Sequence, residues 1–181
     1  HTLLKPDANF SQIQKLCAEA REYDFFSVCI NSYYVKKAAA LLQGSNTKIC
    51  TVVGFPLGAS TMETKRFEAM KAVAEGAKEI DMVLNISAVK SQDWQYALDD
   101  MSSLTQVCHN QGALLKVIFE NCLLTEEEKR KACELAVKAG VDFVKTSTGF
   151  STSGATIEDV KLMRSIVGDK IGVKASGGVR D

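Results

Sequence analysis

The sequence predicts a parallel α/β fold of the kind that closes into a (βα)8 barrel, and two observations carry this prediction. Six short apolar runs alternate with amphipathic helical patterns, and the starts of successive runs lie 24 to 35 residues apart. Alternation at this spacing is typical of βαβ units and a parallel sheet. Charged residues also stand near the carboxyl-terminal halves of at least four runs. Such groups converge on the rim of a barrel, whereas an open sheet gathers them at one switch point.

The elements follow in chain order from these runs. The opening H-T-L-L is expected to be the tail of a strand, and later strands are predicted over 25–30, 49–55, 79–85, 114–120, 142–147 and 171–175. Helices are predicted over 10–22, 32–43, 62–75, 92–110, 126–139 and 156–167. Gly76 should end the third helix, Thr125 and Glu128 should form a capping box at the start of the fifth, and Gly140 should end it.

Residues 1–181 are expected to form one barrel domain, because only two prolines and no linker-like stretch interrupt the pattern. Eight units of about 29 residues would need about 230 residues, and a typical barrel has about 250. The barrel is therefore expected to be truncated, with parts of the first and all of the last βα unit absent. Unpaired strand edges would invite association.

Composition excludes several classes of function. The formal net charge is 0, and no segment concentrates Lys and Arg on one face, so no nucleic-acid partner is expected. No apolar run approaches the roughly 18 residues that a membrane span needs. Six cysteines without a C-x-x-C pair and only two histidines make a metal site improbable. Reduced thiols within apolar patterns indicate a cytoplasmic protein.

Lys145 is the most informative residue, because it lies within the apolar run D-F-V-K-T-S at 142–147. Burying an ammonium group is costly unless it is paired or neutral. A desolvated lysine with a lowered pKa is the nucleophile that a Schiff-base enzyme needs. The alternative is a lysine that ends its strand in water.

Other charged residues in apolar runs predict a shared polar site. Lys174 lies in I-G-V-K, and if its strand neighbours that of Lys145, each ammonium disfavours the charge on the other and brings Lys145 towards neutrality. Asp81 lies in E-I-D-M-V-L-N, where a carboxylate is rarely present for stability. Lys116 and Glu120 share a strand face and either extend this network or pair with each other.

The motifs together resemble the deoxyribose-phosphate aldolase family over the whole length. They are H-T-L-L-K-P, V-V-G-F-P-L-G, E-I-D-M-V-L-N, K-V-I-F-E, V-K-T-S-T-G-F and V-K-A-S-G-G-V-R. The resemblance implies a class I aldolase with a (βα)8 fold, without a metal or cofactor. Its partners would be a small phosphorylated sugar and acetaldehyde, because the family splits 2-deoxyribose 5-phosphate reversibly into glyceraldehyde 3-phosphate and acetaldehyde.

The resemblance also assigns roles by position. Lys145 matches the Schiff-base lysine, Lys174 the lysine that lowers its pKa and moves protons, and Asp81 the acid/base carboxylate that works through water. The implied substrate-binding residues are Thr146 and Thr148 at the sugar hydroxyls and Gly149, Gly177 and Gly178 at the phosphate. Cys29 and Lys116 are candidates for the pocket wall, although Cys29 could simply pack in the core, and the threonines could make strand-end hydrogen bonds.

The sequence departs from the family at both ends, where an Asp before H-T-L-L and an eighth strand with a phosphate-binding loop are lacking. Two other functions stay open. One is an inactive or partly active fragment of such an aldolase. The other is a different phosphate-binding barrel lyase or isomerase with Asp81 or Glu120 as its base, which would not need two lysines. A homo-oligomer also stays open.

Overall fold

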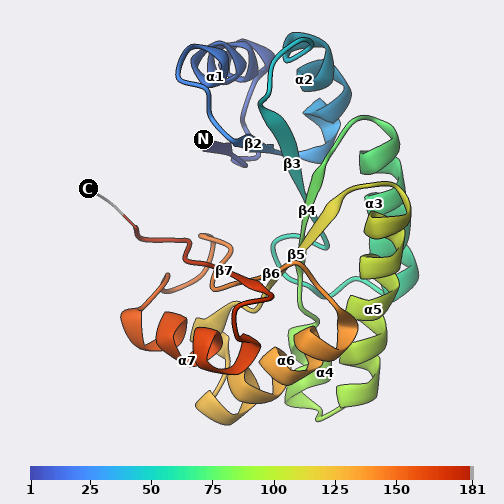
Figure 1. Ribbon diagram of the computed structural model, residues 1–181, viewed down its shortest axis with the longest axis vertical. Helices are drawn as coiled ribbons and strands as arrows, with labels where there is room; N and C mark the ends of the chain where they lie inside the picture. The colour runs from blue at the N-terminus through green and yellow to red at the C-terminus, as the bar shows by residue number, and fades with distance from the viewer. Residues whose placement is uncertain (180–181) are drawn as a thin grey trace.

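The computed structural model describes residues 1–179, and its centre is one parallel sheet in which the spatial order of the seven strands is their order in the chain. Figure 1 shows the sheet curled into an incomplete barrel with the helices outside it and β1 and β7 at its two ends. The strands are β1 (Thr2–Leu3), β2 (Ser27–Ile30), β3 (Lys48–Val53), β4 (Glu79–Val83), β5 (Leu114–Ile118), β6 (Phe143–Lys145) and β7 (Gly172–Lys174). The predicted truncated (βα)8 architecture is confirmed.

Each α-helix lies in the connection between two successive strands. The helices are α1 (Phe10–Glu22), α2 (Val35–Leu41), α3 (Met62–Ala74), α4 (Ile86–Lys90), α5 (Trp94–Asn110), α6 (Glu126–Ala139) and α7 (Ile157–Val167). Two 3₁₀ turns, η1 (Ser32–Tyr34) and η2 (Asn121–Leu123), follow β2 and β5. None of the helices within residues 1–179 has the length and apolar character needed to cross a bilayer.

The helix boundaries follow local capping chemistry. Thr125 and Glu128 make the predicted capping box at the start of α6, and Gly140 ends that helix with φ 70°. The helix α4, whose cap is Asn85, was not predicted, because it is only five residues long and lies directly before α5. The predicted helix 32–43 begins instead as η1 and continues as α2.

Alternation along the strands sorts apolar from charged side chains. Ile80 and Met82 of β4 are fully buried and belong to the main apolar core, while Asp81 between them points to the opposite face. Lys116 likewise lies between the core residues Leu115 and Val117 on β5. The same alternation that builds the core between sheet and helices therefore places charges on the inner face of the curled sheet.

A buried ion pair fastens two helices to the carboxyl end of β4. Lys65 of α3 and Asp100 of α5 are both fully buried, with Nζ 2.5 Å from Oδ2. The same Nζ donates to the carbonyl oxygen of Val83 at 3.0 Å. Burial lowers the pKa of Lys65 and raises that of Asp100, in each case against the attraction of the partner. The pair therefore links the helical layer to the rim where the charged residues gather.

Candidate active site

Lys145 and Asp81 form a buried ion pair on the inner face of the sheet. Lys145 is the last residue of β6, and its Nζ donates to Oδ2 of Asp81 at 2.7 Å. Asp81 has no exposed surface, and Lys145 is 6% exposed. The alternative that Lys145 ends its strand in water is therefore wrong.

Lys116 occupies the other oxygen of Asp81. Its Nζ lies 2.8 Å from Oδ1 of Asp81 and 3.0 Å from Oε2 of Glu79, and it contacts Sγ of Cys50 at 3.5 Å. Burial opposes its charge, but Cys50, Asp81 and Glu79 hold the pKa of Lys116 well above its ordinary value. Lys116 is thus a fixed cation of the site, and of the two predicted arrangements it extends the network and does not pair with Glu120.

The charge state of Lys145 differs from the expectation. Burial lowers the pKa of Lys145, but its contact with Asp81 outweighs burial, so the pKa lies above its ordinary value. Burial raises the pKa of Asp81, but Lys145, Lys116 and Lys174 lower it further, so it lies well below its usual range. The prediction of a near-neutral Lys145 was wrong for this arrangement, because the sequence could not show that Asp81 lies between the lysines.

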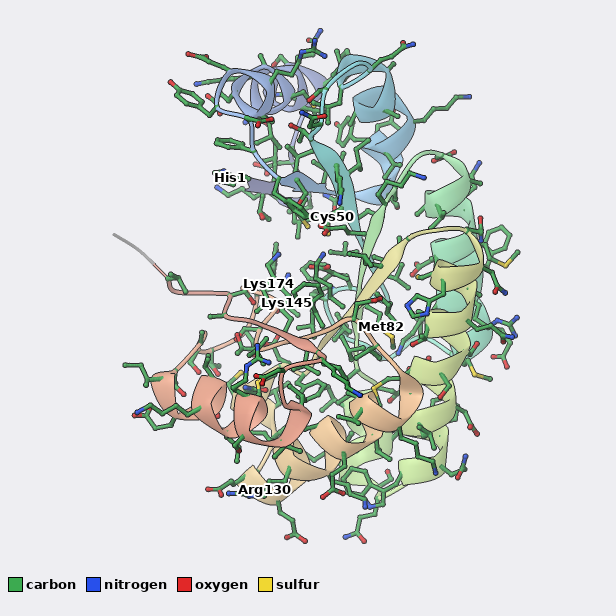
Figure 2. All side chains as sticks on the ribbon, viewed as in Figure 1. His1, Cys50, Met82, Arg130, Lys145 and Lys174 are labelled. Atoms are coloured by element: carbon green, nitrogen blue, oxygen red, sulfur yellow. The ribbon has the colours of Figure 1, made fainter. Side chains whose placement is uncertain are left out.

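Lys174 stands beside Lys145. The two are register partners on the neighbouring strands β6 and β7, and Figure 2 shows both on the concave side of the sheet, facing the region of Cys50. Lys174 is only partly buried. The expected adjacency of the two lysine strands is confirmed, and Lys174 adds a third positive charge around Asp81.

The hydroxyl groups after β6 are engaged within the protein. The Thr146 hydroxyl donates to the carbonyl oxygen of Ser176 and accepts from its backbone N–H, both at 3.1 Å. The Thr148 hydroxyl donates to the buried carboxylate of Glu120, which also accepts from the Thr148 backbone N–H at 3.3 Å. These are the strand-end hydrogen bonds that the sequence left as one of two alternatives.

The glycine loops after β6 and β7 touch each other. Gly149, Gly177 and Gly178 have φ values of 84°, 75° and 72°, the left-handed region that glycine adopts without strain. A Cβ on Gly154 would lie 2.0 Å from the carbonyl oxygen of Gly177, and Ala155 N–H donates to that oxygen at 3.0 Å. Glycine is therefore needed where the two loops pack, at the open end of the inner face.

Cys29 and Cys50 line the wall opposite the lysines. Both are buried, and the Cys50 thiol donates to Oδ1 of Asp81 at 3.2 Å. Sequence reasoning did not select Cys50, although it shares a strand face with Val52, which is in register with Asp81. The ligand atoms of Cys29, Cys50 and Asp81 lie within 4.8 Å of one another, so these residues are a candidate metal-ligand group. Both oxygens of Asp81 are, however, bound by lysines.

A curled parallel barrel that carries a buried lysine and carboxylate on its inner face defines an enzyme of the barrel aldolase class. The chain belongs to the DeoC/LacD family of aldolases, because the model of that family, described as "DeoC/LacD family aldolase", matches residues 1–181.

Relatives support this assignment. The chain is 61% identical over 181 residues to a deoxyribose-phosphate aldolase of Brevibacillus brevis and covers 81% of that protein. It is 62% identical over 180 residues to a deoxyribose-phosphate aldolase of Clostridium perfringens, of which it covers 80%. A solved structure of deoxyribose phosphate aldolase from Aeropyrum pernix, described as tetrameric, superposes on 99% of this chain and 75% of that chain, with 33% identity and a TM-score of 0.91.

Proposed function

We propose that this chain catalyses the reversible cleavage of 2-deoxyribose 5-phosphate into glyceraldehyde 3-phosphate and acetaldehyde, with Lys145 forming the Schiff base. The observation that best supports this proposal is the buried contact between Nζ of Lys145 and Oδ2 of Asp81, 2.7 Å long. It lies on the inner face of a barrel that belongs to an aldolase family. A lysine in this position has a partner that can take up and return protons within hydrogen-bond reach.

The chemistry assigned to Lys145 begins with loss of its proton. The free amine adds to the substrate aldehyde carbon, water leaves, and an iminium ion forms on Nζ. Loss of the proton from the C3 hydroxyl then allows the C2–C3 bond to break, and the iminium accepts the electron pair as an enamine. Protonation of the enamine and hydrolysis release acetaldehyde and return the amine.

Asp81 and the lysines around it have separate roles in this proposal. Asp81 moves protons near Lys145 through water, while Lys116 stays charged because Glu79 and Asp81 both hold it. Lys174 moves protons and disfavours the charge on Lys145. Lys116, Lys145 and Lys174 together with Glu79 and Asp81 carry a net charge of +1, which favours an anionic substrate.

The phosphate is proposed to bind at the glycine loops after β6 and β7. Backbone N–H groups of successive turn residues can point together at an anion. Gly149, Gly177 and Gly178 have the backbone conformation for this, and the contact between Gly154 and Gly177 holds the two loops together. Oligomers of this chain are also proposed, because the relative from Aeropyrum pernix is described as tetrameric.

Trapping with borohydride tests the assignment of Lys145. The protein is incubated with acetaldehyde and sodium borohydride, and peptide mass mapping should find one ethylated lysine, at position 145. Lys145→Met should lose both the adduct and the release of acetaldehyde from 2-deoxyribose 5-phosphate. Lys131→Met, which removes a surface lysine paired with Glu134, should keep both.

The outcomes separate the alternatives. An adduct on another lysine would refute the role of Lys145. Turnover without an adduct would favour a barrel enzyme that uses Asp81 or Glu120 as a base, and an adduct without turnover would indicate a partly active fragment.

A further inference from the structure

Two cysteines on neighbouring strands are placed to react with each other. Cys29 of β2 and Cys50 of β3 are register partners in the parallel pair of these strands. Neighbouring strands lie about 4.8 Å apart, and a disulfide spans Cα separations of roughly 4.4–6.8 Å. The two sulfur atoms lie within 4.8 Å of each other, and both side chains are on the inner face. The backbone therefore already brings the pair within the range of a disulfide.

The surroundings favour a thiolate at Cys29. The neighbouring Cys50 thiol and the ammonium groups of Lys145 and Lys174 lower the pKa of Cys29, against burial and the charge of Asp81. The pKa of Cys50 is raised well above its ordinary value by Cys29, burial and Asp81. One sulfur of the pair is thus the better nucleophile, and the other remains a protonated thiol beside it.

The same charges argue against a resident cation. Cys29, Cys50 and Asp81 offer the ligand types of a thiophilic metal ion. Lys116 and Lys145, however, already bind the two oxygens of Asp81, and Lys174 adds a third positive charge. A divalent cation would have to displace a lysine within a positively charged pocket, whereas oxidation of the thiols adds no charge.

We propose that Cys29 and Cys50 form a reversible disulfide when the protein meets a hydroperoxide. The Cys29 thiolate attacks the outer oxygen of the hydroperoxide, the O–O bond breaks, and Cys29 becomes a sulfenic acid as an alcohol or water leaves. The Cys50 sulfur then attacks the Cys29 sulfur, the S–O bond breaks, and water carries away the oxygen and the Cys50 proton. Two thiols and one hydroperoxide give one disulfide, one water and the alcohol or a second water.

The reaction would change the contacts of Asp81. Cys50 donates its thiol proton to Oδ1 of Asp81 and contacts Nζ of Lys116. In the disulfide this proton is gone, so Asp81 loses one of its hydrogen bonds. The disulfide is therefore a modification next to the proposed catalytic carboxylate, although its formation does not depend on the proposed function.

Peptide mapping tests the proposal on the whole chain. The protein is treated with hydrogen peroxide, quenched with N-ethylmaleimide in denaturant, and digested with trypsin without a reductant. Peptides 22–36 and 49–65 each hold one of the two cysteines and no other. The expected result is one species linking these peptides, a loss of two of the six free thiols, and recovery of both with dithiothreitol.

Matched variants identify the pair. Cys29→Ala and Cys50→Ala should each abolish the linked species. Cys122→Ser should leave it unchanged, although Cys122 is more accessible than the pair and its pKa is also lowered. If Cys29→Ala or Cys50→Ala is unstable, the peptide map of the oxidised wild-type protein still tests the proposal. Oxidation of Cys29 to sulfinic acid without a link, or a link that joins other cysteines, would overturn the proposal.

Discussion

The Nζ of Lys145 lies 2.7 Å from Oδ2 of Asp81, and this contact holds the proposed nucleophile in its charged form. Only the free amine attacks a carbonyl, so the carboxylate of Asp81, which positions Lys145, also slows its attack by stabilising the protonated form. Lys145 must therefore lose its proton before its amine adds to the substrate carbonyl. The pH dependence of imine formation should therefore measure how strongly Asp81 raises the pKa of Lys145.

Asp81→Asn should separate imine formation from turnover. The charge of Asp81 raises the pKa of Lys145, so its removal lowers that pKa and increases the free amine at neutral pH, tenfold for each unit. The pH midpoint for borohydride trapping of acetaldehyde should thus move to lower pH. Turnover should fall by about 10²–10⁴, the usual contribution of a general acid or base.

The control for this experiment is Glu134→Gln, which removes a surface carboxylate paired with Lys131. It should change neither the trapping profile nor turnover. An unchanged trapping midpoint in Asp81→Asn would mean that Asp81 does not set the charge of Lys145.

Lys174→Leu should have the opposite effect on Lys145. It removes a positive charge from the neighbouring register position, so the pKa of Lys145 rises and the free amine at neutral pH becomes scarcer. Turnover should drop, and part of it should return at alkaline pH. Lys170→Leu, an exposed lysine before β7, should leave the profile unchanged. A uniform loss at every pH in Lys174→Leu would indicate a role in binding only.

Lys65→Met should destabilise the fold by about 3–5 kcal/mol, because it leaves the buried carboxylate of Asp100 unpaired. The free energy of unfolding in urea measures this loss. The double variant Lys65→Met/Asp100→Leu should recover much of it, since no buried charge then remains. Lys131→Met, at an exposed ion pair, should lose about 0–1 kcal/mol. Equal losses in the single and double variants would contradict this account.

Gly154→Ala should weaken selection of the phosphate. The added Cβ would lie 2.0 Å from the backbone oxygen of Gly177, so the loops after β6 and β7 must move apart. The KM for 2-deoxyribose 5-phosphate should rise, while the KM for unphosphorylated deoxyribose should change little. Gly112→Ala, where φ is 67° but a Cβ would meet nothing within 4 Å, introduces backbone strain away from these loops and should leave the KM for 2-deoxyribose 5-phosphate unchanged. A parallel loss for both sugars would place the phosphate elsewhere.

The fold could be predicted because each strand and each helix has its own short periodic pattern of apolar residues in the sequence. The apolar runs located β2 to β7, and Thr125, Glu128 and Gly140 located the ends of α6. Five of the six predicted strands, all except 25–30, extend one or two residues beyond the carboxyl end that the structure shows. There the backbone leaves the sheet to enter the site, as at Glu120, whose φ is 53°. Hydrophobic pattern does not record such a turn, because Glu120 and its neighbours remain buried.

The members of the site were more predictable than their pairing. An unusual lysine or carboxylate in an apolar run was enough to select Lys145, Lys116 and Asp81. Asp81 lies between Lys116 and Lys145 because of the register and curvature of β4, β5 and β6. The sequence of any one of these strands does not reveal this arrangement. The charge state of Lys145 was predicted wrongly because its contact with Asp81 could not be foreseen. Cys50 was missed because a cysteine in a strand looks the same in the core and in a pocket.

The sheet order has a consequence for how the chain folds. Every strand from β2 to β7 pairs with the strand that precedes it in the chain, and a helical crossover separates the two strands of each pair. The starts of paired strands nevertheless lie 21 to 35 residues apart, and parallel pairing across such separations is intrinsically slow, because loop-closure entropy is lost before the contacts form. We therefore expect the joining of β1 to β7 into one sheet to be a slow step of folding. Until β5 and β6 have joined the sheet, the carboxylate of Asp81 has neither Lys116 nor Lys145 as its partner, so burial of this charge depends on strands that follow it in the chain.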